Sequence, residues 1–490
     1  MKPPNILVFM TDHQRGDTVL PEHPAVTPNL STFASQGLTF TQAFCPSPHC
    51  CPSRATFHTG LYPSRHGVWN NVCNEQALTL GLKEGVRLWS QDLAQAGYRL
   101  AWSGKWHVSV IESPADRGWQ ELFVSGQARG TASGWDHYRR LAQETEPAAR
   151  GEGEILRPGY GTYRMYGARD EGNAHDEQAV TAAVDALGQL ASGGDPWAMF
   201  VGCQGAHDPY RVPQRFLDLY DIDSVALPPS FDDELLDKPQ IYRRMRQMRW
   251  GQLSRREVRE GIRHFWAYCS YLDELFGEVL AALAATGAAD NTLVLYCSDH
   301  GDYCGEHGLF AKGIPCFRGA YHVPAVIRWP AGLADPGRRV DSFVSLADFA
   351  PTFIELACGE AQRDFSGASL APFLRGRRPP DWRDEIHTQC NGLELYFTQR
   401  SVMTRECKYV FNGFDEDELY DLRNDPHETR NLSADPAWQD VKREMVGRMW
   451  RFACREKDTA PSAYITVGLA PWGPAEAFRQ PSPQDRGGAS

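Results

Sequence analysis

The chain has 490 residues, of which 42% are hydrophobic and 23% charged, a composition typical of a globular protein with one large domain and a smaller one. Its formal net charge of -12 argues against a general nucleic-acid binder. No apolar run is long enough to span a membrane, and the apolar residues 6–10 are too few for a signal peptide. The 13 cysteines follow no framework spacing. We therefore predict a cytoplasmic protein with mostly reduced thiols, no membrane contact and no nucleic-acid partner.

Residues 5–10 form a largely apolar run that ends in Thr11-Asp12-His13. Such a run is typical of a strand buried on both faces of a parallel sheet. Ligands bind at the carboxyl ends of the strands in these sheets, so Asp12 and His13 lie where chemistry usually occurs. A capped helix over 27–34 is predicted to follow.

Residues 50–60 read Cys-Cys-Pro-Ser-Arg-Ala-Thr-Phe-His-Thr-Gly, which is the strongest functional signal in the chain. Pro52 suits the first turn of a helix, so we expect Cys50 at a helix N-terminus, where free N–H groups and the helix dipole favour an anion. Arg54 adds a guanidinium whose forked donors suit sulfate or phosphate. The alternative for Cys50 is a buried structural thiol, the more frequent role of an isolated cysteine.

Two further helix-and-strand units also place polar residues after a buried strand. A helix over 88–96 and a strand over 98–102 precede Ser103-Gly104-Lys105-Trp106-His107. A helix over 174–190 and a strand over 197–203 precede His207. Taken alone, Lys105 and His107 would also fit a solvated loop, and His207 would also fit a structural histidine.

Two long stretches carry no readable site motif. Residues 108–166 have no steady period and are interpreted as an insertion over the site. Residues 210–265 carry a basic run, interpreted as the solvated face of one or two helices, with a groove for an anionic polymer as the alternative. A helix packed on the core is predicted from the apolar stripe formed by Leu272, Leu275, Phe276, Val279, Leu280 and Leu283.

The last third of the chain begins with a predicted strand over 291–298 that ends in Asp299-His300-Gly301-Asp302, and Lys312 follows in the loop beyond it. After a basic, proline-rich link near 375–382, short alternating segments and a helix over 438–454 predict a small antiparallel sheet closed by a helix. We assign residues 1–375 to a catalytic domain, 376–460 to this C-terminal subdomain and 461–490 to an irregular tail.

Together these motifs resemble the type I, formylglycine-dependent sulfatases of the alkaline phosphatase superfamily. The resemblance rests on Cys50-x-Pro52-Ser53-Arg54 followed by Thr59-Gly60, on Gly104-Lys105-Trp106-His107 and on Ser298-Asp299-His300-Gly301, and it extends from Asp12 to about Leu432. It implies the alkaline-phosphatase-like α/β fold, a mixed and mostly parallel sheet flanked by helices, with a smaller C-terminal α+β domain. The strand pattern independently predicts an α/β parallel sheet.

The resemblance also implies roles for residues. A formylglycine-generating enzyme would oxidise Cys50 to formylglycine (3-oxoalanine), whose hydrate attacks sulfur, and His107 would help to remove a proton from that hydrate. Lys105, His207 and Lys312 would bind the substrate. The general acid for the leaving alcohol is either His207 or Lys312. The implied catalytic set is Cys50, Arg54, Lys105, His107, His207 and Lys312.

A divalent metal is implied as well, with the candidate ligands Asp12, His13, Cys50, Asp299 and His300. Asp12 and Asp299 are hard oxygen ligands suited to Ca²⁺, while the histidine nitrogens leave Mn²⁺ open. Many sulfatases carry Asp-Asp where this chain has Asp12-His13. His13 is therefore a ligand, a group that contacts a ligand, or simply a neighbour.

The expected function is hydrolysis of an organic or carbohydrate sulfate ester to an alcohol and inorganic sulfate. One alternative is a phosphonate or phosphate ester hydrolase of the same superfamily, because the same cations suit either tetrahedral anion. Another is a sulfated-glycan binding protein in which Cys50 is never converted. The sequence leaves open the identity of the alcohol and whether the chain forms a homo-oligomer.

Overall fold

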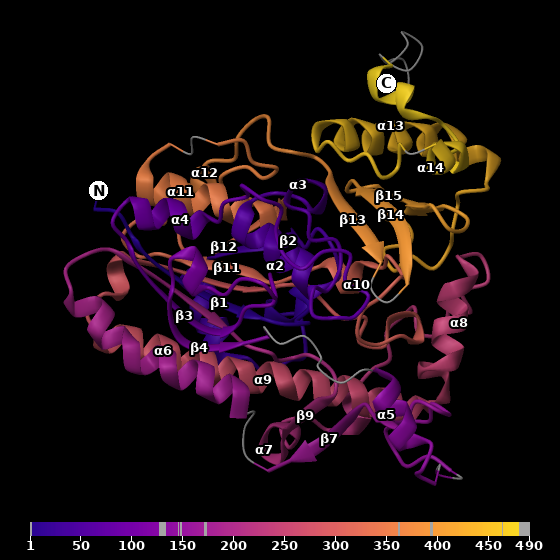
Figure 1. Ribbon diagram of the computed structural model, residues 1–490, viewed down its shortest axis with the longest axis horizontal. Helices are drawn as coiled ribbons and strands as arrows, with labels where there is room; N and C mark the ends of the chain where they lie inside the picture. Colours follow the sequence, from indigo (N-terminus) through magenta and orange to yellow (C-terminus); the bar gives the residue numbers. More distant parts are fainter. Residues whose placement is uncertain are drawn as a thin grey trace.

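The protein is described here from a computed structural model, which covers residues 2–126, 134–145, 147, 149–170, 174–360, 363–392, 395–462 and 464–479. Its centre is an eight-stranded sheet (Figure 1). All neighbouring strands are parallel except β11, which is antiparallel to both of its neighbours. In order across the sheet, the strands are β12 (Arg338–Ser345), β2 (Leu38–Phe44), β11 (Ala325–Arg328), β10 (Thr292–Ser298), β1 (Asn5–Thr11), β8 (Trp197–Gly202), β3 (Arg99–Lys105) and β4 (Gln120–Ser125).

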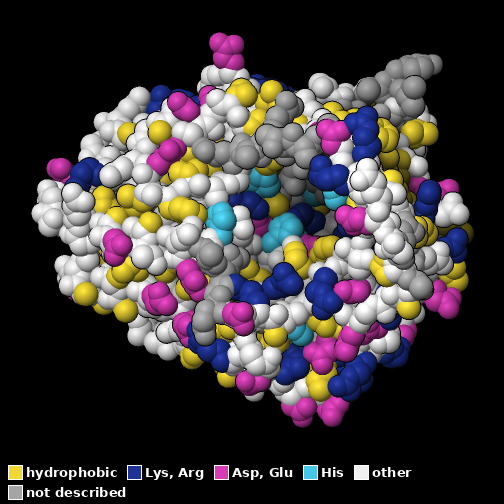
Figure 2. Space-filling model, turned by 60° about the horizontal axis from the view of Figure 1, so that its bottom comes forward, with side chains coloured by type: hydrophobic (Ala, Val, Ile, Leu, Met, Phe, Trp, Pro, Cys, Tyr) yellow, Lys and Arg dark blue, Asp and Glu magenta, His cyan; other side chains and the backbone are white. Residues whose placement is uncertain are grey.

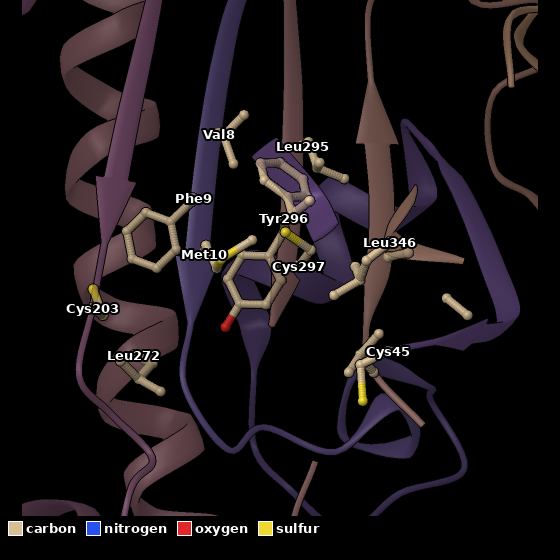
Figure 3. Packing of buried hydrophobic residues seen from close by; sticks show 14 of the residues in the cluster. Val8, Phe9, Met10, Cys45, Cys203, Leu272, Leu295, Tyr296, Cys297 and Leu346 are labelled. Atoms are coloured by element: carbon tan, nitrogen blue, oxygen red, sulfur yellow. The ribbon is translucent and has the colours of Figure 1, made fainter. Parts of the chain in front are cut away.

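The two central strands are buried on both faces, as their apolar runs predict. In β1 and β10, Phe9 and Tyr296 stack with ring centroids 5.5 Å apart, and both rings contact Phe276. Figure 3 shows these strands with Val8 and Met10 beside Leu295 and Cys297. Burial of this apolar surface is the main force that holds the sheet together.

Helices cover both faces of the sheet (Figure 1). One face is covered by α1 (Pro28–Ser35), α6 (Ala174–Ser192) and α9 (Arg255–Ala285), and the other by α2 (Cys50–Thr59), α4 (Trp89–Gln95) and α11 (Phe349–Cys358). The predicted apolar stripe lies on α9, where all of its members except Leu280 are buried. The basic run lies on α8 (Gln240–Met248) and the start of α9, and its arginines are exposed or half-buried, as expected for a solvated face.

Two differences from the sequence prediction concern the catalytic half. Strand β3 runs to Lys105, three residues beyond the predicted end, because Ser103 and Gly104 still pair with β8. The predicted insertion contains β4, which pairs in parallel with β3 at the edge of the sheet. An edge strand of this kind is only half-buried, so its sequence has neither a continuous apolar run nor a clear alternation.

A second, four-stranded antiparallel sheet follows, with β13 (Ile386–Gly392), β14 (Tyr396–Met403), β15 (Cys407–Asn412) and β16 (Glu418–Asp421) in that order. It packs on α13 (Gln439–Arg455) around a separate apolar cluster that includes Val402, Tyr409 and Trp450. The predicted fold class, a mixed sheet flanked by helices plus a smaller antiparallel sheet with a helix, is confirmed. The division of the chain at residue 375 stays a prediction.

The predicted irregular tail contains α14 (Tyr464–Leu469) and η9 (Pro474–Phe478). Trp450 donates a hydrogen bond to the carbonyl of Trp472 at 2.8 Å, and Arg443 forms an ion pair with Glu476 at 3.0 Å. These contacts with α13 order a segment whose Pro and Gly content suggested no structure. None of the helices within the described ranges is both long and apolar enough to cross a bilayer.

The remaining elements are short. They are η1 (Gly16–Val19), α3 (Pro63–His66), η2 (Ala115–Arg117), α5 (Gly134–Leu141), β5 (Glu154–Ile155), β6 (Tyr163–Arg164), β7 (Tyr166–Arg169), β9 (Tyr210–Pro213), α7 (Gln214–Leu217), η3 (Ile222–Ser224), η4 (Trp250–Gln252), η5 (Ala289–Asn291), η6 (Glu306–Gly308), α10 (Arg318–Tyr321), η7 (Leu346–Asp348), α12 (Ala371–Leu374) and η8 (Pro436–Trp438).

Candidate active site

The predicted site residues meet at one edge of the central sheet. Strands β10, β1, β8 and β3 are parallel neighbours, so their carboxyl ends lie side by side. Hydrogen bonds between the segments that follow the strands fix this edge: Asp12 N donates to the carbonyl of Gly205 at 2.7 Å, and Asp299 N donates to the carbonyl of Thr11 at 3.2 Å. Figure 2 shows a hollow in which histidine, lysine and arginine side chains gather.

Cys50 is the first residue of α2, as Pro52 predicts, and is 1% exposed. Its Sγ lies 3.3 Å from His300 Nε2, 3.4 Å from Lys312 Nζ and 3.7 Å from Asp12 Oδ1. Burial and the Asp12 carboxylate raise the pKa of the Cys50 thiol, but the charges of Lys105, Lys312 and His300 outweigh them and hold it well below its ordinary value. An anion at this position is therefore stabilised.

Two buried carboxylates, those of Asp12 and Asp299, lie close to Cys50 and Arg54. Arg54 Nε donates to Asp299 Oδ2 at 2.7 Å, while Arg54 Nη2 lies 3.5 Å from Asp12 Oδ2. Lys105 forms a close ion pair with the same Asp12 oxygen. Burial raises the pKa of Asp12, but Lys105 and the neighbouring histidines lower it well below its ordinary value. Asp12 is thus ionised inside the protein because cations surround it.

The donor atoms of Asp12, Cys50, Asp299 and His300 lie within 4.8 Å of one another, and all four residues are buried. His300 Nδ1 lies 2.9 Å from the carbonyl of Gly301 and donates to it, so Nε2, which lies 3.3 Å from Cys50 Sγ, would be the ligand atom once it has lost its proton. Two carboxylates and an imidazole form a donor set that suits a divalent cation with oxygen and nitrogen ligands, such as Ca²⁺ or Mn²⁺. These residues fit the implied metal.

His13, the fifth predicted ligand, is not a member of this four-residue group. It has a φ of 63°, and its Nδ1 lies 3.1 Å from Asp302 Oδ2, which also accepts a hydrogen bond from the Tyr210 hydroxyl at 2.7 Å. Burial raises the pKa of Asp302 to about 7. The other ring nitrogen of His13, Nε2, contacts Lys312 Nζ. His13 belongs instead to a second group of possible ligands, together with Asp12 and His207, so the choice among the three roles stays a prediction.

The cationic and imidazole groups surround the space above Cys50. Lys312 Nζ lies 3.3 Å from His207 Nε2, and His207 Nδ1 lies 3.3 Å from Asp208 Oδ1. Burial and Lys105 lower the pKa of His107, but hydrogen bonds with Cys50 and Cys73 outweigh them and raise it. All six predicted catalytic residues are thus brought together.

Sequence reasoning missed two groups in this centre. Asp302 belongs to the quoted run after β10, but nothing in the sequence indicates its contact with His13. Cys73 has no motif around it and reaches His107 only through the fold. Gly104 explains how β3 can deliver Lys105: its φ is 104°, and a Cβ there would lie 2.0 Å from the carbonyl oxygen of Gly202.

Comparisons with known proteins agree with this geometry. A sequence profile of the Sulfatase family matches residues 4–360, and one described as N-sulphoglucosamine sulphohydrolase, C-terminal, matches residues 305–455. The uncharacterized sulfatase YidJ of Escherichia coli is 29% identical over 502 residues, which cover 99% of this chain and 95% of that protein. Choline-sulfatase of Rhizobium meliloti is 31% identical over 461 residues, covering 88% and 83%. The crystal structure of the phosphonate monoester hydrolase of Agrobacterium radiobacter has the same fold, with a TM-score of 0.75, 23% identity and coverage of 94% and 97%.

Proposed function

The chain belongs to the sulfatase family of the alkaline phosphatase superfamily and is a sulfuric ester hydrolase, and from this premise we propose that it cleaves organic or carbohydrate sulfate esters by means of formylglycine formed from Cys50. One observation carries the proposal. The Cys50 side chain lies at the N-terminus of α2, within 3.7 Å of Asp12, His300 and Lys312. An electrophile or nucleophile at this position would be surrounded by the groups that a sulfate ester requires.

A sulfate ester resists hydrolysis because its oxygens shield sulfur and its alkoxide leaves poorly. An enzyme must neutralise the oxygens, supply a nucleophile and protonate the alcohol. Hydrated formylglycine at residue 50 would supply a hydroxyl nucleophile, and a divalent cation held by Asp12, Asp299 and His300 would supply positive charge. Lys105 and Lys312 then bind the remaining sulfate oxygens, since both ammonium groups lie beside the Asp12 and Cys50 pair.

Proton transfer falls to the two histidines on either side of Cys50. We assign protonation of the leaving alcohol to His207, whose side chain is 39% exposed and faces the cavity outside the centre. His107, which is in contact with Cys50, is assigned to accept a proton from residue 50 so that the sulfate can depart. Asp208 holds the His207 ring through Nδ1.

The metal would be held by Asp12, Asp299 and His300 together with residue 50. Arg54 fixes one of these carboxylates by its 2.7 Å hydrogen bond to Asp299. Ca²⁺ is the favoured ion because hard oxygen ligands predominate, and Mn²⁺ is the alternative because His300 contributes nitrogen.

Mass spectrometry of the peptide that contains Cys50 tests the mechanism, using protein produced together with a formylglycine-generating enzyme. Conversion of the thiol to the aldehyde lowers the mass by about 18 Da. We expect the Cys50→Ala variant to lose turnover of para-nitrophenyl sulfate. Cys454→Ala is the control, because the Cys454 thiol is exposed on α13, outside the residues of the candidate site. Full turnover by Cys50→Ala would overturn the formylglycine mechanism.

Hydrolysis of a phosphonate or phosphate ester is the second candidate. Its support is that the same cations suit either tetrahedral anion, and that the multifunctional alkaline phosphatase superfamily protein PehA of Trinickia caryophylli is 25% identical, covering 92% of this chain and 95% of that protein. The ratio of kcat/KM for para-nitrophenyl sulfate to that for para-nitrophenyl phenylphosphonate separates the two. Tight binding of sulfated glycans without any turnover would instead indicate a binding protein.

A further inference from the structure

A cavity of about 430 Å³ opens beside the catalytic centre. Lys105 and His207 line it on the side of the centre, and two further cations, Arg169 and Arg211, also line it. Because Lys105 and His207 belong to the catalytic centre and also line this cavity, the alcohol part of a sulfate ester bound at Cys50 would extend into the cavity. Figure 2 shows lysine and arginine side chains along the hollow that contains the histidines.

The two arginines are positioned by a small parallel ribbon formed by β7 and β9, in which Gly167 pairs with Arg211. Arg169 Nε donates to the carbonyl of Arg211 at 2.7 Å, and the Arg169 guanidinium lies 5.5 Å from the centroid of the Tyr271 ring. One terminal nitrogen of Arg169 is buried without a hydrogen-bond partner among the described residues. The ribbon therefore holds the Arg169 guanidinium in place at the wall of the cavity.

The cavity has more positive charge than its own acidic group can balance. Among the described residues that line the cavity, Asp208 is the one carboxylate. It already accepts a hydrogen bond from the Tyr163 hydroxyl and lies 3.3 Å from His207 Nδ1. Within the described part of the chain, neither Arg169 nor Arg211 forms an ion pair. Lys105, by contrast, is paired with Asp12. The buried Asp176 carboxylate also interacts with the charge of Arg169, but it accepts hydrogen bonds from Gln204 N and Gly205 N and does not line the cavity. The two arginines thus place positive charge at the cavity wall.

We propose that the alcohol portion of the substrate carries a second oxyanion, a carboxylate or a further sulfate, which Arg169 and Arg211 bind. Guanidinium groups form charge-assisted, often bidentate hydrogen bonds with such groups. A quaternary ammonium alcohol such as choline, named in one relative, would instead meet two like charges. This inference rests on the proposed sulfatase function and identifies the class of ester on which it acts.

The test compares three esters with the mature enzyme: para-nitrophenyl sulfate, the same ester with a ring carboxylate, and choline sulfate. A charged hydrogen bond of this kind contributes about tenfold to a hundredfold in affinity. We expect the carboxylated ester to have the lowest KM and choline sulfate the lowest kcat/KM. Arg169→Gln and Arg211→Gln should each raise KM for the carboxylated ester by about tenfold or more, with little effect on kcat or on the uncharged ester.

The control is Arg328→Gln, because Arg328 lies on β11 opposite Val294, away from the carboxyl end of β10, and should affect no ester. If Arg169→Gln fails to fold, Arg211→Gln still decides, since Arg211 is exposed on β9. Equal losses for charged and uncharged esters, or a preference for choline sulfate, would overturn the inference while leaving the sulfatase function intact. No turnover of any sulfate ester by protein with confirmed formylglycine would overturn the function itself, and the inference with it.

Discussion

Replacement of Lys312 by methionine tests the electrostatic design of the centre. Lys312 Nζ lies 3.4 Å from Cys50 Sγ and 3.3 Å from His207 Nε2, so it faces both the attacking and the leaving side of a bound ester. A charge pair about 4 Å apart at an effective dielectric constant of about 20 is worth about 4 kcal/mol. At about 1.4 kcal/mol per factor of ten, this predicts a fall in kcat of about a thousandfold. Loss of one oxyanion donor typically costs about a hundredfold to a thousandfold, in agreement.

The assay measures kcat on para-nitrophenyl sulfate after the formylglycine content of each preparation has been determined. Burial lowers the pKa of Lys312, but Cys50, Asp12 and Asp208 outweigh it and raise it, so the charge also stabilises the fold and Lys312→Met should unfold at a lower temperature. The assay is therefore run at a temperature at which both proteins stay folded. Lys457→Met, at an exposed lysine of the C-terminal subdomain, is the control for loss of one positive charge. The reasoning is refuted if Lys312→Met, at equal formylglycine content, keeps kcat within about threefold of the parent enzyme.

Three further outcomes are expected. Gly104→Ala should lower the free energy of unfolding by more than about 2 kcal/mol and abolish turnover, because its Cβ would lie 2.0 Å from a carbonyl oxygen of β8. Gly97 also has a positive φ but lies in open space, so Gly97→Ala should cost only about 1 kcal/mol in urea unfolding. Equal costs for the two variants would contradict this reasoning. Dialysis against a chelator should remove activity, and Ca²⁺ or Mn²⁺ should restore it; activity that survives complete metal removal, measured by elemental analysis, would exclude the metal. Burial raises the pKa of Glu385, but hydrogen bonds with His387 and Arg448 outweigh it and lower the pKa from 4.5 to about 2. The ionised carboxylate therefore stabilises the fold above pH 4.5, and this contribution is lost as the pH falls toward 2. Glu385→Gln should therefore be less stable than the parent by up to about 2 kcal/mol near neutrality, and this difference in the free energy of unfolding should disappear in acid. A difference that does not change with pH would show that the charge of Glu385 is not its origin.

Local patterns were sufficient for much of the fold and of the site. The apolar runs that became β1 and β10 are continuous because both faces are covered, and Pro52 marks the start of α2 beside Cys50. Each of these signals depends only on residues near one another in the sequence. Strand β4 gave no such signal, since a half-buried edge strand satisfies neither pattern.

Contacts between distant segments could not be predicted in this way. His13 and Asp302 are 289 residues apart, yet their side chains lie 3.1 Å apart once β1 and β10 pair. The same holds for Arg169 and Arg211, whose shared cavity depends on the pairing of β7 with β9. Their residue types are common on protein surfaces, so only the three-dimensional arrangement singles them out.

The pairing of β1 with β10 also has a consequence for how the chain matures. Strand β1 lies between β8 and β10, and Asn5 lies opposite Thr292, so one of the two partners of the first strand is synthesised only 287 residues later. Contacts of such large sequence separation form late, because the intervening chain must first be ordered. Throughout that interval Cys50, which ends up 1% exposed, stays outside any finished core. On the proposed mechanism, this order of synthesis would give a modifying enzyme a period in which to reach the Cys50 thiol before the sheet is complete.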